Sequence, residues 1–540
     1  MKDFSTNPEF KDKPRDRAQD VVFVRLTGFF GFGIFLIACA YFYVSWVNLF
    51  FPIASWVAAV ILTLAIVSAL FIGKKVDLDV FSGPPDLTKI SRPGVVAALA
   101  ALVAWAIVVM FRPTADVDSN VYHLPLSLLI NHSRWYAGIG KLCHHYGFPN
   151  ADSVLASVFT STGVAGFENI ANFFIWVIFG AGIFLYLTAK KIKAIVSFWL
   201  AMMFILTPDL FWQSYNMGTD MAQACFLVFG LLAFKEDRLD QAWLFFAMSA
   251  MFKHLGIIAL GLTAVYLVWQ LAARKINRDI FIRPVFLLGS AIIFTVMLRA
   301  FVATGNPVYP VGGWNFAGWG ISPVAQQEMV EGSLRYYSEV QRSLPGFIAL
   351  IKSLLVSPHQ FKSSFWFSPF LLVCLFAAAG RLLSARRDFK VQARYSYLGF
   401  MLLVLLAAWF WASPLVRFIA GPLVFVSISL FVYVYHNVSS QLLRRAVCAG
   451  LVLTLAAFTF NVFRHFKNYV RPLMFASPEK AAANMPFGPD IFSTVRSPDG
   501  FVYSKSSSNY CGRMESPCLS RYSVGGEDEL IMEYRRQNRL

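Results

Sequence analysis

Residues 168–189 read ENIANFFIWVIFGAGIFLYLTA, and the basic run KKIK follows at 190–193. After Glu168 the stretch contains no charged residue, and a helix of about 20 such residues crosses the roughly 30 Å hydrocarbon core of a membrane. The lysines at its end are typical of a loop on the cytoplasmic side. Because an apolar run followed by basic residues recurs along the chain, the sequence predicts an all-α polytopic membrane protein.

Composition agrees with this class. Of the 540 residues 57% are hydrophobic and 14% are charged, whereas soluble domains have about 45–50% and about 25%. The net charge of +17 is explained by basic cytoplasmic loops. No module rich in lysine and arginine with interleaved aromatic residues is present, so we expect no nucleic-acid partner.

Apolar runs divide the chain into three parts. Residues 1–22 are expected to be a cytoplasmic tail, 23–463 a transmembrane domain, and 464–540 a small extracytoplasmic C-terminal region. The transmembrane domain is expected to contain about thirteen spans, near residues 23–47, 52–73, 94–112, 168–189, 194–209, 220–234, 240–252, 255–273, 280–301, 365–382, 396–412, 418–437 and 446–463.

Basic residues assign the sides of the membrane. The loop 113–167 carries only Arg134 and Lys141, whereas the alternate loops carry pairs and triplets of basic residues such as Lys74-Lys75. This asymmetry places the N-terminus inside and the loops 113–167 and 302–364 outside.

Both outside loops contain apolar residues at helical spacing. Leu126, Leu129 and Ile130 share one face after Pro125, a residue suited to the first turn of a helix. A similar face runs through residues 344–355. We expect amphipathic helices that lie on the outer membrane surface.

The C-terminal region contains Cys511 and Cys518, only seven positions apart. In an oxidising compartment this spacing predicts a local disulfide. A metal site is the alternative, but two further ligands are not evident.

The first outside loop opens with Asp116-Val-Asp-Ser-Asn-Val-Tyr-His-Leu-Pro125. Asp118 has two interpretations of equal weight: a cap of a short surface helix, or a general base beside a membrane-borne leaving group. Asp116 is the neighbouring candidate. Tyr122 and His123 add hydrogen-bond donors next to the carboxylates, and we assign them to substrate binding.

Further polar residues are expected at the same membrane face. Asp220 either caps a span or orients an acceptor or a metal. Lys253, next to His254, either reaches the interface or binds a lipid phosphate, and Arg417 is a second candidate for that phosphate. Asn306, in Gly305-Asn-Pro-Val-Tyr-Pro310, is a further candidate for substrate binding.

Several kinds of site are not indicated. The chain has no P-loop, dinucleotide fingerprint, zinc-protease motif or nucleophile elbow. His144 and His145 are adjacent, so in regular structure their rings point apart, and we predict no metal site. The acidic residues leave open whether a divalent metal takes part. A series of charges in mid-span, which an ion-coupled transporter needs, is also missing.

The order of these residues resembles that of the GT-C superfamily of membrane glycosyltransferases, in particular bacterial protein O-mannosyltransferases and the lipid A aminoarabinose transferase. The resemblance covers roughly residues 94–440. It rests on the Asp116–Pro125 stretch after an apolar span, followed in order by Pro208, Asp220, Lys253-His-Leu-Gly256, Gly305-Asn-Pro307 and Pro414-Leu-Val-Arg-Phe418.

The resemblance implies sugar transfer from a polyprenyl-phosphate donor to a glycan, lipid or protein acceptor on the outer face of the bacterial inner membrane. Asp118 matches the family's acidic residue in the first outside loop. Arg417 matches a basic residue near the outer end of a late span, and Lys253 a basic residue that faces the donor phosphate.

Two other functions remain as alternatives. A lipid-linked glycan ligase or polymerase would depend on Arg335 or His359 in the second outside loop rather than on Asp118. A transporter or flippase of lipid-linked saccharides would move its substrate without forming a glycosidic bond.

Overall fold

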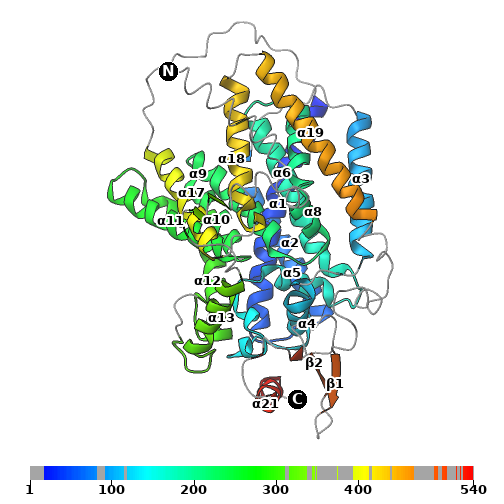
Figure 1. Cartoon of the computed structure of the whole chain (residues 1–540), viewed down its shortest axis with the longest axis vertical. Helices are drawn as coiled ribbons and strands as arrows, with labels where there is room; N and C mark the ends of the chain where they lie inside the picture. The colour runs from blue at the N-terminus through cyan, green and yellow to red at the C-terminus, as the bar shows by residue number, and fades with distance from the viewer. Residues whose placement is uncertain are drawn as a thin grey trace.

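The computed structural model describes residues 17–81, 92–112, 114, 118–310, 315–336, 393–412, 416–437, 441–467, 492–496, 502–506, 518–519 and 527–538, with isolated positions between 343 and 374 and at 523. These residues form a helical bundle with one small sheet (Figure 1). The helices up to the second large loop are α1 (Arg17–Asn48), α2 (Ser55–Lys75), α3 (Arg92–Met110), α4 (Leu124–His132), α5 (Ala151–Thr160), α6 (Ile170–Ala189), α7 (Ala194–Ile205), α8 (Pro208–Trp212), α9 (Thr219–Lys235), α10 (Leu239–Ala250), α11 (His254–Ala272), α12 (Pro284–Thr304) and α13 (Pro323–Tyr336). The later elements are α17 (Ala393–Ala412), α18 (Val416–Asn437), α19 (Gln441–His465), β1 (Phe492–Arg496), β2 (Val502–Ser506), β3 (Cys518–Leu519) and α21 (Glu527–Asn538).

Eight helices within the described residues are long and apolar enough to cross a membrane. They lie in α1, α2, α6, α11, α12, α17, α18 and α19. The prediction of a polytopic helical membrane protein is therefore confirmed. The count of thirteen spans stays a prediction, because α3, α7, α9 and α10 do not meet the same criterion and the predicted span 365–382 lies outside the described residues.

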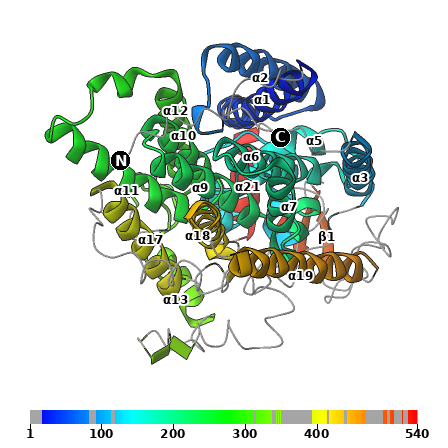
Figure 2. The same cartoon turned by 90° about the horizontal axis from the view of Figure 1, so that it is seen from above.

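Helix α9 forms the centre of the bundle. Every residue from Thr219 to Phe234 is buried, and α9 packs against α10, α18 and α6 (Figure 2). A helix that is apolar on all sides is stable only inside other protein or lipid. With 17 residues in α9 and 12 in α10, the two helices are about 26 and 18 Å long at 1.5 Å per residue, shorter than a hydrocarbon core.

The basic residues predicted to lie inside gather at one end of the bundle, here called the basic end. There the turns between helices are joined by ion pairs, and His436 near the end of α18 bonds through Nε2 to the Lys190 carbonyl at 2.8 Å. The ion pairs are Lys190–Glu236 at 2.5 Å, Arg238–Asp79 at 3.1 Å, Arg283–Asp240 at 3.0 Å and Arg394–Asp237 at 3.0 Å. Lys190, Arg238, Arg283 and Arg394 thus lie together at one end of the bundle.

The opposite end, here called the loop end, carries residues 118–167. Helix α4 begins with Pro125 in its first turn, and Leu126, Leu129 and Ile130 are buried, as predicted. Its other face is mostly buried too, because α5 and the end of α1 cover it. At the end of α1, Asn48 Nδ2 donates to the carbonyl of Ser133, the residue that follows α4, at 2.9 Å. The expectation that α4 lies on the membrane surface is therefore wrong, because protein covers it on both sides. The expected helix within 344–355 falls largely outside the described residues.

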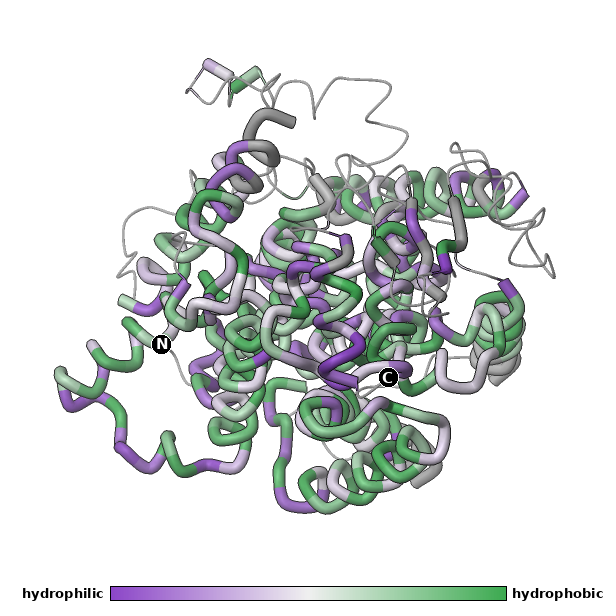
Figure 3. Tube along the Cα trace, turned by 90° about the horizontal axis from the view of Figure 1, so that it is seen from below, coloured by the Kyte–Doolittle hydropathy of each residue, from purple (hydrophilic) through white to green (hydrophobic). Residues whose placement is uncertain are grey.

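The C-terminal region also lies at the loop end (Figures 1 and 3). Arg134 Nη2 donates to Gln537 Oε1 of α21 at 3.0 Å, and Ser523 Oγ donates to the Leu142 carbonyl at 2.6 Å. Strand β2 pairs antiparallel with β1 and parallel with β3, so the region contains a small sheet as well as α21. Viewed from this end, the mostly hydrophilic α21 crosses the middle of a bundle whose helices are mainly hydrophobic (Figure 3).

Gly256 allows α11 to start directly against α10. A Cβ at this position would lie 2.7 Å from Ala250 Cα and still closer to the backbone between Ser249 and Ala250, which cannot move aside as a side chain would. We expect Gly256→Ala to lower the free energy of unfolding by about 1–3 kcal/mol. Thermal unfolding of the purified protein measures this.

The matched control is Gly261→Ala in the same helix, where an added Cβ meets nothing within 4 Å. Since alanine favours a helix over glycine by roughly 0.5–1 kcal/mol, this variant should be as stable as the wild type or more so. Equal effects of the two substitutions would contradict the close contact assigned to Gly256.

Candidate functional site

The stretch after α3 is held in place by hydrogen bonds to other segments of the loop end. It forms a π turn, Ser119–His123, that runs into α4, and the N–H of Leu124 donates to the Ser119 carbonyl five residues back. Ser119 Oγ donates to the Met217 carbonyl at 2.5 Å. Single π turns occur often at functional sites.

Asp118 precedes this π turn and is half-buried. Its side chain makes no capping hydrogen bond to the turn, so the capping interpretation does not account for it. The hydrogen bond from Ser119 to Met217 holds the residue after Asp118 against the turn before α9. Met217 precedes Asp220 by three positions in the chain. Asp116 lies outside the described residues.

Asp220 and Lys253 form an ion pair through Oδ1 and Nζ. Asp220 is buried in the first turn of α9, and its Oδ2 accepts a hydrogen bond from Gln213 Nε2 at 3.3 Å. Lys253 is half-buried between α10 and α11. The two residues were predicted separately as a substrate ligand and a phosphate ligand, and the structure places them in direct contact.

Helix α18 brings Phe418 to the same place. Lys253 Nζ lies 3.4 Å from the centroid of the Phe418 ring, a favourable cation–π contact. Arg417 is the preceding residue of α18, so its backbone lies at the loop end close to Lys253. The side chain of Arg417 lies outside those described.

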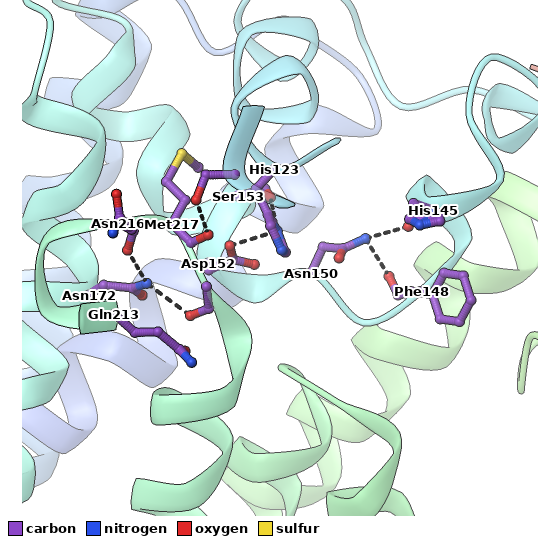
Figure 4. Close-up of polar contacts among 12 residues, drawn as sticks. His123, His145, Phe148, Asn150, Asp152, Ser153, Asn172, Gln213, Asn216 and Met217 are labelled. Atoms are coloured by element: carbon purple, nitrogen blue, oxygen red, sulfur yellow. Dashed lines mark hydrogen bonds and ion pairs between the residues drawn. The ribbon is translucent and has the colours of Figure 1, made fainter. Parts of the chain in front are cut away.

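A buried imidazole–carboxylate pair lies near Met217 in the turn before α9 (Figure 4). His123 Nδ1 lies 2.8 Å from Asp152 Oδ2 and 3.3 Å from Ser153 Oγ. The two side chains are 2% and 1% exposed, and the Asp152 carboxylate has no other polar contact among the described residues. The pair joins the π turn to the first turn of α5.

Asp152 is a residue that sequence reasoning missed. It occupies the first turn of α5, where an acidic residue is favoured by the helix dipole alone. Only its burial and its contact with His123 mark it as part of the site. Its place between Asn150 and Ser153, ahead of an apolar face, is the weak signal that was available.

Aromatic rings line the next part of the loop end. The Tyr122 ring lies between those of His123 and His145, with centroids 4.1 and 4.3 Å away. His144 and His145 stack edge to face at 4.2 Å. Burial, together with the neighbouring His144 and His123, lowers the pKa of His145 well below its usual value, so His145 is neutral at physiological pH.

His254 and Asn306 belong to one structural unit. His254 Nε2 donates to the Tyr309 carbonyl at 2.8 Å. Asn306 is fully buried, and its Oδ1 accepts the N–H of Val308 at 3.0 Å while its Nδ2 donates to Gln326 at 3.0 Å. Asn306 thus shapes the turn that contacts His254, and its assignment to substrate binding stays a prediction.

Buried polar residues form hydrogen bonds to the turn before α9. Asn172 of α6 donates to the carbonyls of Asn216 and Gly218, at 2.8 and 2.9 Å. Arg112 Nη1 donates to Asn216 Oδ1 at 3.2 Å and stacks over the Tyr215 ring. Buried polar groups held in this way give the turn before α9 a single conformation.

Two further predictions meet the limits of the described residues. Cys511 lies outside them, and Cys518 begins β3 with its side chain undescribed, so their disulfide stays a prediction. Among the described residues no group of three or more His, Cys, Asp or Glu side chains is arranged to hold a metal ion. That His144 and His145 bind no metal stays a prediction.

A protein-family model described as "Domain of unknown function (DUF8201)" matches residues 22–424, three quarters of the chain. The chain belongs to this family. The matched range includes the π turn, the ion pair and the start of α18. No curated protein and no solved structure matches the chain.

The His123–Asp152 pair should contribute to stability. Because both groups are buried, removing one leaves the other without a partner, which typically costs about 3–5 kcal/mol. We expect Asp152→Ala and His123→Ala each to lower stability strongly, and the double variant to lose less than the sum. Unfolding of the four proteins in one detergent measures the coupling. Ser153→Ala is the control, with a loss of about 1 kcal/mol; strict additivity would contradict the pairing.

His145 should make stability depend on pH. Its folded-state pKa lies below that of the unfolded chain, so below about pH 6.5 the unfolded state takes up a proton that the folded state does not. Stability should therefore fall with pH by up to about 1.4 kcal/mol per pH unit. We expect a smaller fall for His145→Gln between about pH 7.5 and about pH 5.5, measured by thermal unfolding.

The control for this measurement is His132→Gln. His132 is exposed at the end of α4, so its removal leaves the buried rings intact. If His145→Gln kept the full pH dependence of the wild type, another group would have to be responsible.

Proposed function

We propose that this protein is an integral-membrane glycosyltransferase of GT-C type, which moves a sugar from a polyprenyl-phosphate donor to a glycan, lipid or protein acceptor. The reaction takes place at the loop end, on the extracytoplasmic side of a bacterial inner membrane. In this proposal α3, α7, α9, α10 and the segment 365–382 complete a bundle of thirteen spans.

One observation carries the proposal. Polar residues singled out in separate segments of the chain come together at the loop end, although up to 300 positions separate them. The π turn with Asp118 bonds to the turn before Asp220, Asp220 pairs with Lys253, and Lys253 contacts Phe418 beside Arg417. A carboxylate next to a cluster of cations at the end of an apolar bundle suits a polar acceptor and a lipid phosphate.

Asp118 is the proposed general base. It is half-buried, and it is attached to a π turn fixed by Ser119 and by the His123–Asp152 pair. His123 and Asp152 act as positioning residues, because they hold the turn that carries the base. Tyr122 contributes to the wall of the acceptor site.

Lys253 and Arg417 are the proposed ligands of the donor phosphate. Asp220 holds the ammonium of Lys253 in place, and a phosphate oxygen shares that ammonium with the Asp220 carboxylate. Arginine binds phosphate through two parallel N–H groups. His254, held by the Tyr309 carbonyl, fixes the start of α11 and thereby the position of Lys253.

The proposed reaction is a direct displacement at the anomeric carbon of the sugar. The acceptor oxygen forms a bond to this carbon while its proton passes to Asp118. The bond between the anomeric carbon and the phosphate oxygen breaks, and polyprenyl phosphate leaves with the electron pair. Lys253 and Arg417 stabilise the negative charge that develops on the leaving phosphate.

Asp118→Asn tests this assignment. The purified protein is placed in lipid with radiolabelled polyprenyl-phosphate sugars, and release of free polyprenyl phosphate is measured. Loss of a general base typically lowers the rate by about 10²–10⁴-fold. The amount of folded protein in the membrane should stay the same, since asparagine has the size of aspartate.

The matched control is Asp279→Asn. Asp279 is exposed in the turn between α11 and α12 at the basic end, far along the bundle from Asp118, so this variant should keep full activity. Unchanged release by Asp118→Asn would refute the base. Transbilayer movement of the lipid-linked sugar without any release would favour a flippase instead.

A further inference from the structure

Arg299 is a buried arginine that the proposed reaction does not use. It lies in α12, five residues before the end of that helix at the loop end, and it is 6% exposed. Its Nη1 and Nη2 groups form no hydrogen bond within the described part of the chain. Its backbone carbonyl accepts a hydrogen bond from Trp135 Nε1 at 3.1 Å.

The surroundings of Arg299 hold the guanidinium in place without neutralising it. The group lies over the Trp135 ring, with Cζ 3.8 Å from the centroid. Trp135 is itself fixed, because its backbone N–H donates to the Asn48 carbonyl of α1 at 2.7 Å. Residues 284–304 of α12 and residues 124–151 around Trp135 contain no aspartate or glutamate, so the nearby sequence offers no anion.

Helix α1 lies beside the part of α12 that carries Arg299. It packs beside α12 (Figure 2), and Trp46 Nε1 donates to Thr295 Oγ1 at 3.1 Å, one turn below Arg299. Ser45, 1% exposed, lies next to the Tyr41 hydroxyl, which faces both Ser45 and Arg299. The guanidinium of Arg299 and the hydroxyl of Ser45 are thus two buried donor groups in the seam between α1 and α12, and the guanidinium has no acceptor among the described residues.

A buried cation without a partner is costly, because desolvation is not offset by an opposite charge. The planar guanidinium matches the oxygens of a phosphate group through two parallel hydrogen bonds. Arg299 lies about 7.5 Å from the end of α12 at 1.5 Å per residue, near the end of a helix that is long and apolar enough to cross a membrane. The phosphate of an anionic lipid has the charge and the geometry that this guanidinium lacks.

The apolar residues beside the seam suit a lipid chain. Phe294, five residues deeper in α12, is 58% exposed and stacks on Trp46 with centroids 6.3 Å apart. We propose that Arg299 and Ser45 bind the phosphate of an anionic lipid in the seam between α1 and α12, with its chain along Trp46 and Phe294. This site does not depend on the proposed transferase activity.

The test uses the full-length protein in nanodiscs of phosphatidylcholine alone, or of phosphatidylcholine mixed with phosphatidylglycerol. The lipid retained by the protein is counted by native mass spectrometry, and the thermal midpoint is measured. We expect phosphatidylglycerol to bind and to raise the midpoint of the wild type, since a ligand of the folded state stabilises it. Arg299→Met should weaken this binding roughly tenfold to a hundredfold and abolish the shift.

The control is Arg283→Met, at the other end of the same helix. Arg283 is exposed and paired with Asp240, so this variant should keep the response to phosphatidylglycerol. A separate sample of wild type in phosphatidylcholine receives inorganic phosphate, which should not raise the midpoint.

Two results would overturn the proposal, and both are read from proteins that fold. Wild-type protein that retains no phosphatidylglycerol would show that the seam holds no lipid. Inorganic phosphate that stabilises the wild type as much as the lipid would replace the lipid by a free anion. If Arg299→Met fails to fold, Arg299→Lys takes its place, because lysine keeps the charge but lacks the planar guanidinium. Arg299→Lys should bind phosphatidylglycerol more weakly than the wild type. Equal binding would count against the site.

Discussion

The ion pair between Asp220 and Lys253 joins the elements on which the loop end depends. Asp220 begins the central helix α9, and Lys253 occupies the break between α10 and α11. The buried carboxylate of Asp220 would be costly alone, and the half-buried ammonium of Lys253 offsets its charge. The contact of Lys253 with Phe418 adds α18 to the same point. One pair of side chains therefore fixes where four helices meet.

The division between an apolar bundle and a polar end follows from hydrogen bonding. Inside the hydrocarbon region only helices satisfy their own backbone groups, so irregular segments such as the π turn and the turn before α9 gather at the end. There Asn172 and Ser119 supply the hydrogen bonds that these segments need. Ser119, which fixes the π turn, directly follows Asp118 in the chain.

Lys253 and Arg299 are two cations at the same end with different surroundings. Lys253 has a carboxylate partner and a place among the proposed site residues. Arg299 lies over the Trp135 ring, in a helix that contains no acidic residue. The first arrangement suits a phosphate that comes and goes during a reaction, and the second suits a resident lipid. Both residues lie within residues 22–424, the range that the family model matches.

The sequence by itself determined the class of protein, the basic end and the residue types of the candidate site, because hydropathy, charge bias and polar residues at span ends are local properties. It could not show that α9 and α10 are buried inside the bundle, since a short helix buried in protein is as apolar as one in lipid. Only the tertiary structure decided that Asp220 faces Lys253, that Asp152 faces His123, and that no acidic side chain in the described part of the chain pairs with Arg299. These contacts join residues far apart in the chain, and they depend on how the helices pack.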